Sequence, residues 1–138
     1  MGRDEVILLD THVIVWLTTE NAALGKQSRV LYERAREAGE IAVSAISFWE
    51  MAMLIGKGRL GAARSPAQHR IMILDGGAQE LPVTGDVAIL AAELERLHGD
   101  PADRLIIATA ITHGATLMTA DRALLSWRHR LRRQDASK

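Results

Sequence analysis

The sequence predicts a three-layer α/β/α sandwich built on a mainly parallel sheet of four to five strands. Short apolar runs of strand length alternate along the chain with longer segments that have the spacing of amphipathic helices. The runs at residues 6–9 and 41–45 do not alternate with charged residues, which is typical of strands covered by helices on both faces. This alternation of strands and helices indicates an α/β fold.

The first half of the chain is expected to begin at the centre of this sheet. Val6 to Leu9 form an apolar run that ends at Asp10, and a similar run follows at residues 41–45. The helix between these runs ends at Gly39, because glycine is favoured just after helix C-termini. The elements expected here are the strand 6–9, an apolar helical segment at 13–17, the helix 28–39, the strand 41–45 and the helices 47–56 and 65–76.

The second half continues the alternation and carries clear helix boundaries. The apolar residues of segment 86–97 fall on one stripe of a helix. Asp100 and Pro101 mark the start of the next helix, because aspartate is a preferred N-cap and proline is favoured at the first helical position. Gly114 ends that helix. The elements expected here are the strand 79–83, the helices 86–97 and 102–113, the strand 116–119, a short helix from 121 to about 127 and a possible edge strand at 130–132.

Length and composition describe a single domain spanning residues 1–138. The chain is 48% hydrophobic and 25% charged, which is ordinary for a globular domain. It has no cysteine, and this excludes disulfide frameworks, thiolate metal sites and thiol nucleophiles. The apolar stretch near the amino terminus is too short for a signal peptide or a membrane span, so we expect a cytoplasmic protein without membrane contact.

Charge is balanced overall but distributed unevenly. The chain has 17 basic and 17 acidic residues. The tail at residues 128–138 holds five of the basic residues and one of the acidic ones, so the rest of the chain has an excess of acid. Short charged termini are usually only solvated, but the arginines of this tail are also candidates for contact with phosphate groups.

Four carboxylates are expected to meet at one edge of the sheet. Asp10 ends the first strand, and Asp121 follows the fourth strand by two residues. Glu50 and Asp103 each lie in the first turn of a helix that should start at the same edge, where ligands of open α/β sheets bind. A cluster of oxygen ligands suits Mg²⁺ or Mn²⁺, and such ions support hydrolysis of phosphodiester bonds.

Each of these acids also has a structural explanation. Glu50 follows Ser47 at the spacing of a capping box, which would turn its carboxylate back to the start of its own helix. Asp103 lies where a negative charge stabilises the helix dipole. Asp10 and Asp121 could each cap the segment that follows. Both interpretations therefore stand for any single acid.

Five short motifs occur in the order found in PIN-domain ribonucleases. They are Leu8-Leu9-Asp10-Thr11-His12, Val43-Ser44-Ala45 with Ser47-Phe48-Trp49-Glu50, Gly58-Arg59-Leu60, His98-Gly99-Asp100-Pro101-Ala102-Asp103-Arg104 and Leu117-Met118-Thr119-Ala120-Asp121. The chain thus resembles a PIN-domain ribonuclease, in particular a VapC-type toxin of a type II toxin–antitoxin system, over residues 5–127. The resemblance implies the α/β/α sandwich, a Mg²⁺ or Mn²⁺ site and endonucleolytic cleavage of RNA, often tRNA or rRNA.

The resemblance also assigns roles to individual residues. The conserved acids of the family fall on Asp10, Glu50, Asp103 and Asp121. Asp10 and Asp103 would be the principal metal ligands, and the other two acids would complete the site directly or through water. Thr119 and Thr11 could support them, because a hydroxyl there can bond a carboxylate or a water at the metal. A threonine at a helix start more often serves the backbone.

Several cations are candidates for contact with the RNA backbone. Lys57 and Arg59 lie beyond the third predicted helix and could position phosphates without reading bases. Arg104 could do the same, or could pair with a neighbouring acid. Arg130 and Arg132 lie where the family usually has an apolar last strand, so an edge strand and an RNA contact are alternative expectations for the tail.

Histidines and tryptophans near the predicted site also have two candidate roles each. His12 and His98 could touch phosphate, but a capping or surface role is the more common one for such residues. Trp16, Trp49 and Trp127 could stack on bases. In a chain with one phenylalanine and one tyrosine, they are expected mainly as core and interface residues.

The resemblance implies partners as well as a substrate. VapC-type toxins are neutralised by a small antitoxin protein and commonly form homodimers. Their complexes reach promoter DNA only indirectly, through the antitoxin. These partners are expectations from the family, because no motif of this chain identifies them.

Two other functions are compatible with parts of the pattern. A PIN-like module could bind RNA or a protein with little catalytic activity, and acids too far apart to share a cation would favour this function. A receiver-like phosphoacceptor domain also gathers acids at strand ends and binds Mg²⁺. It is disfavoured because no lysine follows the fourth strand and because Glu50 and Asp103 are expected on helices.

Overall fold

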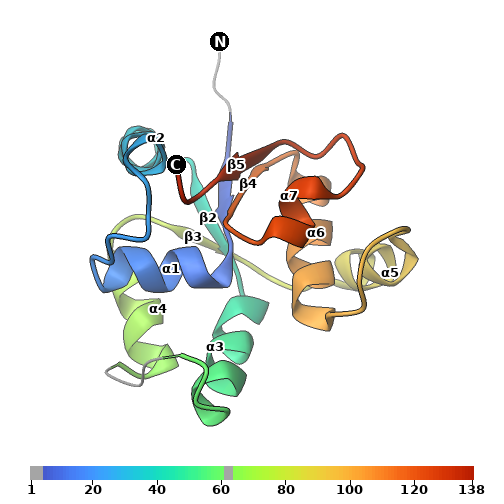
Figure 1. Cartoon of the computed structure of the whole chain (residues 1–138), viewed down its shortest axis with the longest axis horizontal. Coiled ribbons are helices and arrows are strands. Elements are labelled where there is room, and N and C mark those ends of the chain that lie inside the picture. The colour runs from blue at the N-terminus through green and yellow to red at the C-terminus, as the bar shows by residue number, and fades with distance from the viewer. Residues whose placement is uncertain (1–4, 61–63) are drawn as a thin grey trace.

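A five-stranded parallel sheet forms the centre of the computed structural model, which describes residues 5–60 and 64–138 (Figure 1). Every neighbouring pair of strands is parallel, in the order β3-β2-β1-β4-β5. The predicted parallel sheet is therefore confirmed. The strands are β1 (Ile7–Leu9), β2 (Ile41–Ser44), β3 (Gln79–Leu81), β4 (Thr116–Thr119) and β5 (Arg133–Asp135).

Helices cover both faces of this sheet. In Figure 1, α1, α2 and α4 lie on one side of the strands, and α5, α6 and α7 lie on the other. None of the helices in the described parts of the chain is long and apolar enough to cross a membrane. The helices are α1 (Thr11–Thr18), α2 (Lys26–Glu37), α3 (Ile46–Gly56), α4 (Pro66–Asp75), α5 (Gly85–Glu93), α6 (Pro101–His113) and α7 (Arg122–Ser126).

Two buried cores explain why the chain forms three layers. Successive residues of a strand point to opposite faces of the sheet. Leu9 accordingly belongs to one core, with Ile14 of α1 and Tyr32 of α2. Leu8 belongs to the other core, with Ile106 of α6. The central strand is apolar throughout because it supplies both cores, and the predicted α/β/α sandwich is confirmed.

The carboxyl edge of the sheet has a topological switch point at the central strand β1. β1 lies at the centre and pairs with β2 on one side and with β4 on the other, with Leu9 opposite Met118. Asp10 follows β1 directly, and Asp121 follows β4 by two residues. α3 begins two residues after the end of β2, at the same edge. Side chains from distant parts of the sequence thus meet in the region where α/β sheets bind ligands.

The edge strand lies later in the sequence than expected. We predicted it at residues 130–132, and the structure has it at Arg133–Asp135. Arg133 pairs with Leu117 and Asp135 with Thr119 of β4, and the strand is flanked by the buried residues Leu131 and Ala136. The guanidinium of Arg133 donates to the carbonyl oxygens of Leu124 and Trp127, so this arginine is part of the fold.

Helix α5 ends earlier than expected, at Glu93 instead of residue 97. Its end is set by Arg104 of α6, whose guanidinium lies against the chain that leaves the helix. Arg104 donates to the carbonyl oxygens of Ala91, Ala92, Leu94, Leu97 and His98 at 2.7–3.3 Å. This network holds residues 94–98 in an irregular conformation between α5 and α6.

Candidate active site

Three carboxylates of the predicted four converge at the carboxyl edge of the sheet. Asp10, Glu50 and Asp103 each offer a carboxylate oxygen, and these atoms all lie within 4.8 Å of one another. Asp10 and Asp103 are only 6% and 8% exposed, whereas Glu50 is half-buried. Asp121 lies on the rim and also contributes to the lining of the same cavity, which has a volume of about 340 Å³.

Asp10 is both the cap of α1 and the centre of the acidic cluster. Its Oδ1 accepts the backbone N–H of Thr11 at 2.8 Å. Its Oδ2 accepts the hydroxyl of Thr119 at 2.6 Å. The Thr119 hydroxyl oxygen in turn accepts the backbone N–H of Asp121 at 3.1 Å. Thr119 therefore contacts two of the acids, and Asp10 both caps α1 and lies in the acidic cluster.

Glu50 is turned into the site instead of back to its own helix. Helix α3 begins at Ile46, with Ala45 as its N-cap and no side-chain cap. The capping-box interpretation is therefore wrong, and within the described residues the buried Ser47 hydroxyl has no hydrogen-bond partner. The Glu50 carboxylate accepts the hydroxyl of Thr11. A helix that starts one residue before Ser47 presents Glu50 to the first residue of α1.

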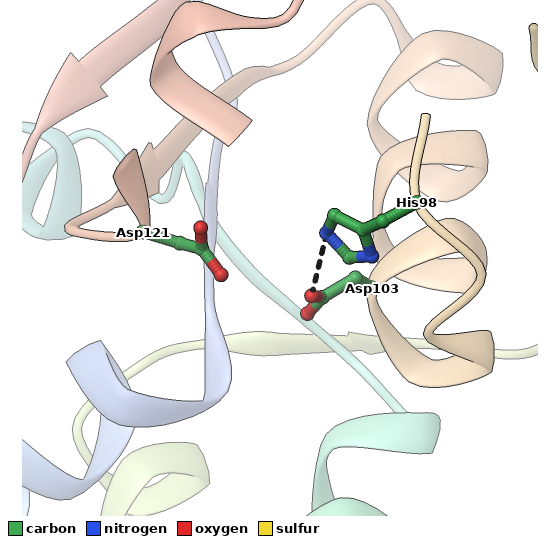
Figure 2. Close-up of side chains that lie close together, drawn as sticks. All are labelled: His98, Asp103 and Asp121. Atoms are coloured by element: carbon green, nitrogen blue, oxygen red, sulfur yellow. Dashed lines mark ion pairs between the residues drawn. The ribbon is translucent and has the colours of Figure 1, made fainter. Parts of the chain in front are cut away.

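Asp103 faces His98 and Asp121 across the mouth of the site (Figure 2). His98 Nε2 lies 3.3 Å from Asp103 Oδ2, the contact shown dashed in the figure. One ligand atom from each of these three residues lies within 4.8 Å of the other two. Asp121 caps α7 through Oδ1, which accepts the backbone N–H groups of Ala123 and Leu124. Its predicted capping role and its position at the site are thus both present.

The cluster holds more negative charge than its surroundings stabilise. Burial and the neighbouring charge of Asp10 raise the pKa of Asp103 to about 8. Burial also raises the pKa of Asp10, against the hydrogen bond from Thr119. Burial raises the pKa of Glu50 in the same way. Carboxylates this close together retain protons unless a cation neutralises them.

The acidic cluster fits a divalent cation of the Mg²⁺ or Mn²⁺ type. Its three converging donors are all carboxylate oxygens, which these hard ions prefer. The raised pKa of Asp103 is the expected sign of a site that lacks compensating positive charge. Thr11 and Thr119 hold Glu50 and Asp10 in place, and such contacts orient metal ligands in proteins.

Two residues at the site were not assigned to it from the sequence. Asp100 lines the acidic cavity and caps α6, where its Oδ1 accepts the backbone N–H of Asp103 at 3.2 Å. His98 was expected near the site in a capping or surface role, and its Nδ1 does accept the backbone N–H of Asp100, but its Nε2 also contacts Asp103. The signal that could have identified both residues is their place in the segment 98–103, which leads into the helix that carries the predicted ligand Asp103.

The cations predicted to contact RNA are distributed over different parts of the structure. Arg59 lines the acidic cavity, and Lys57 is exposed at the end of α3. Arg104 uses its guanidinium on backbone carbonyl oxygens, so it is a structural residue and neither pairs with an acid nor faces the site. Arg130 and Arg132 precede β5 and so lie at the amino edge of the sheet, opposite the acids.

The tryptophans separate into exposed and structural residues. Trp16 lines the acidic cavity, and Trp49 is 52% exposed on α3. Trp127 is buried, stacks on His129 with ring centroids 4.3 Å apart, and donates its indole N–H to the carbonyl oxygen of Glu95. Trp127 therefore has the structural role expected of it and does not offer its face to a base.

Comparisons with known proteins agree with this geometry. A family model for the PIN domain matches residues 7–128. The chain is 40% identical over 124 residues to Ribonuclease VapC22 of Mycobacterium tuberculosis. The aligned region covers 89% of this chain and 92% of that protein. VapBC2 from Rickettsia felis, solved with a DNA fragment from its promoter, matches 94% of this chain and 97% of its own with a TM-score of 0.68 and 18% identity. DNA-bound VapBC from Salmonella typhimurium matches 95% and 98% with a TM-score of 0.65 and 18% identity.

Proposed function

This chain belongs to the PIN-domain family and, within it, to the VapC-type ribonucleases, and from this membership we propose that it is a Mg²⁺- or Mn²⁺-dependent endoribonuclease, the toxin of a toxin–antitoxin pair. The observation that carries the metal dependence is the convergence of carboxylate oxygens from Asp10, Glu50 and Asp103 within 4.8 Å. This spacing disfavours the alternative of a catalytically weak binding module, because the acids are close enough to share a cation.

Each residue of the site has a role in the proposed reaction. Asp10 and Asp103 hold the cation, and Glu50 completes its ligand set directly or through water. A bound Mg²⁺ or Mn²⁺ ion would polarise the phosphate and lower the pKa of a water molecule. Asp121, the exposed acid on the rim, orients the attacking water. Water adds to phosphorus, the bond from phosphorus to one ribose oxygen breaks, and that oxygen leaves as a hydroxyl group.

The RNA substrate is held by cations near the cavity. Arg59 lines the cavity and Lys57 lies two residues before it, so we assign both to contacts with RNA phosphates. The substrate class is a structured RNA such as tRNA or rRNA. We assign the basic residues Arg130 and Arg132 no contact with the phosphate that is cleaved, because they lie at the opposite edge of the sheet.

A small antitoxin is the proposed protein partner. The structural neighbours from Rickettsia felis and Salmonella typhimurium are VapBC complexes bound to DNA. By analogy, this chain forms a homodimer, binds its antitoxin and contacts promoter DNA only through that partner. Exposed apolar side chains offer the surface that such contacts need, among them Trp49 and Met53 on α3 and Ile71 and Met72 on α4.

Cleavage of total cellular RNA by antitoxin-free protein tests the proposal. We expect discrete fragments with Mg²⁺ or Mn²⁺, none with EDTA, and none with Asp10→Asn. Asp75→Asn is the matched control, because Asp75 is exposed at the end of α4. Intact RNA in every lane, with the fold verified by circular dichroism and with RNA binding that is equal in EDTA, would support the binding module instead.

A further inference from the structure

A second pocket adjoins the acidic cavity, and we propose that it binds the RNA backbone next to the cleaved bond. This inference rests on the proposed ribonuclease function. The pocket, called here the flanking pocket, has a volume of about 310 Å³. It lies between the segment that follows α5 and helix α7, and it is lined by Arg96, Leu97, His98, Ala123, Ser126, Trp127 and Arg128.

His98 connects the flanking pocket to the acidic site. Its ring lines the pocket, and its Nε2 lies 3.3 Å from Asp103 Oδ2. Figure 2 shows the same ring facing Asp103, with Asp121 opposite across the mouth of the site. Ala123 of the pocket lies two residues after Asp121. A strand of RNA whose phosphate is held by a cation bound at Asp103 would therefore have this pocket as its immediate neighbour.

The two cavities differ in charge. The acidic cavity is lined by five carboxylates, from Asp10, Glu50, Asp100, Asp103 and Asp121. The described residues that line the flanking pocket include two exposed arginines and no acid. A phosphodiester chain that enters an acidic cavity is repelled except where a cation is bound. Arg96 and Arg128 supply the attraction that the neighbouring phosphate needs.

The pocket is held in shape by its surroundings. Arg96 has a φ of 61°, a left-handed conformation that residues other than glycine rarely adopt. Such conformations persist only where neighbouring groups fix them, and they are common at binding sites. Arg104 provides this restraint, because its guanidinium binds the carbonyl oxygens of Leu94, Leu97 and His98. The Arg96 side chain is thus presented from a restrained backbone.

The chemistry of the lining identifies the ligand as backbone rather than base. Trp127 is buried, stacked on His129 and bonded through its indole N–H, so its face is not open to a base. Arginine side chains contact phosphates without reading sequence. The flanking pocket therefore binds a phosphate and its ribose, and it contributes to affinity for RNA more than to choice of sequence.

The double variant Arg96→Gln/Arg128→Gln tests the proposal. Its matched control is Lys26→Gln/Arg34→Gln, which removes two exposed cations from α2 on the other face of the sheet. With an RNA that the wild-type protein cleaves, we expect KM to rise about tenfold and kcat to change less than about twofold. RNA binding is also measured in the Asp10→Asn background as a function of salt. The slope of the logarithm of the binding constant against the logarithm of the salt concentration should become about 1.4 less steep, which corresponds to the loss of two single-strand phosphate contacts.

The possible outcomes separate this inference from the proposed function. A double variant with the KM and salt slope of the control overturns the flanking pocket and leaves the ribonuclease intact. A wild-type protein that cleaves no RNA rejects the proposed function, and RNA binding still tests the pocket. If RNA binding is unchanged while a polyglutamate peptide binds the double variant more weakly, the pocket belongs to an acidic protein segment and the RNA proposal is overturned.

Discussion

The hydroxyl of Thr119 donates a 2.6 Å hydrogen bond to Oδ2 of Asp10, and it thereby ties together the ends of the two central strands. These residues are 109 positions apart in the sequence. The bond occupies one oxygen of a buried carboxylate and fixes its orientation at the acidic cluster. Asp10 can therefore present a defined set of lone pairs to a cation before the cation binds.

Removing this hydroxyl should weaken the metal site without unfolding the protein. For Thr119→Val, we expect the affinity for Mn²⁺ to fall about 10- to 100-fold, because Asp10 loses a group that orients it. Titration calorimetry measures this affinity, and RNA cleavage should fall in parallel. Thr119→Ser keeps the hydroxyl and should recover most of the loss. Equal affinities for the valine and wild-type proteins would contradict the orienting role.

The stability of the metal-free protein should depend on pH with a definite sign. Burial and the charge of Asp10 raise the pKa of Asp103 from its ordinary value of 3.8 to about 8. At pH values between these two pKa values, Asp103 is protonated in the folded state and ionised in the unfolded state. The free energy of unfolding in EDTA should therefore decrease as pH rises from about 4 to about 8, by up to about 1.4 kcal/mol per pH unit for this group.

Urea unfolding in EDTA at pH 5 and at pH 8 measures this dependence. Asp10 and Glu50 act in the same direction, because their pKa values are also raised. Asp103→Asn should flatten the dependence and stabilise the metal-free protein at pH 8. Mg²⁺ should restore stability to the wild-type protein at pH 8, since it binds the ionised carboxylates. A wild-type stability in EDTA that rises over this range would refute the assignment.

Strong local signals explain what could be predicted from the sequence. Four strands lie within two residues of their predicted positions, and β1 and β2 had the clearest signal, because a strand covered on both faces is apolar throughout. The Asp100-Pro101 pair begins α6, and Gly114, with a φ of 61°, ends it. Asp10 directly follows a predicted strand and Asp121 follows another by two residues, so the predicted fold indicated that they share an edge.

Contacts between distant segments explain what could not be predicted. The segment from Ser47 to Glu50 satisfies a capping pattern locally, but the partner of Glu50 is Thr11, 39 residues away. The edge strand β5 consists of three polar or charged residues and no apolar one, so it has no hydrophobic periodicity to detect. The end of α5 depends on Arg104, whose carbonyl partners lie 6–13 residues earlier. Each of these features is decided by tertiary structure.

The guanidinium of Arg104 should be one of the larger single contributions to stability. Arg104→Gln removes a charged donor from five carbonyl oxygens that the fold has drawn together. We expect the free energy of unfolding to fall by about 2–4 kcal/mol in urea denaturation. Arg36→Gln is the control, because its pair with Glu33 is exposed to solvent and should contribute far less to stability. Similar losses for the two variants would show that the carbonyl network is not a major stabilising feature.

His98 should act as a hydrogen-bond donor at the site and not as a metal ligand. Its Nδ1 accepts the backbone N–H of Asp100 at 3.3 Å, so the ring proton lies on Nε2, which faces Asp103. Binding of a cation at Nε2 would require this proton to move to Nδ1 and would break the bond to Asp100. We expect the ¹⁵N chemical shifts of His98 to report the Nε2–H form both before and after Mg²⁺ is added. His98→Ala should lower kcat about tenfold, and His98→Gln, which keeps an N–H donor, should recover part of it. A shift to the Nδ1–H form on addition of Mg²⁺ would instead make His98 a ligand of the cation.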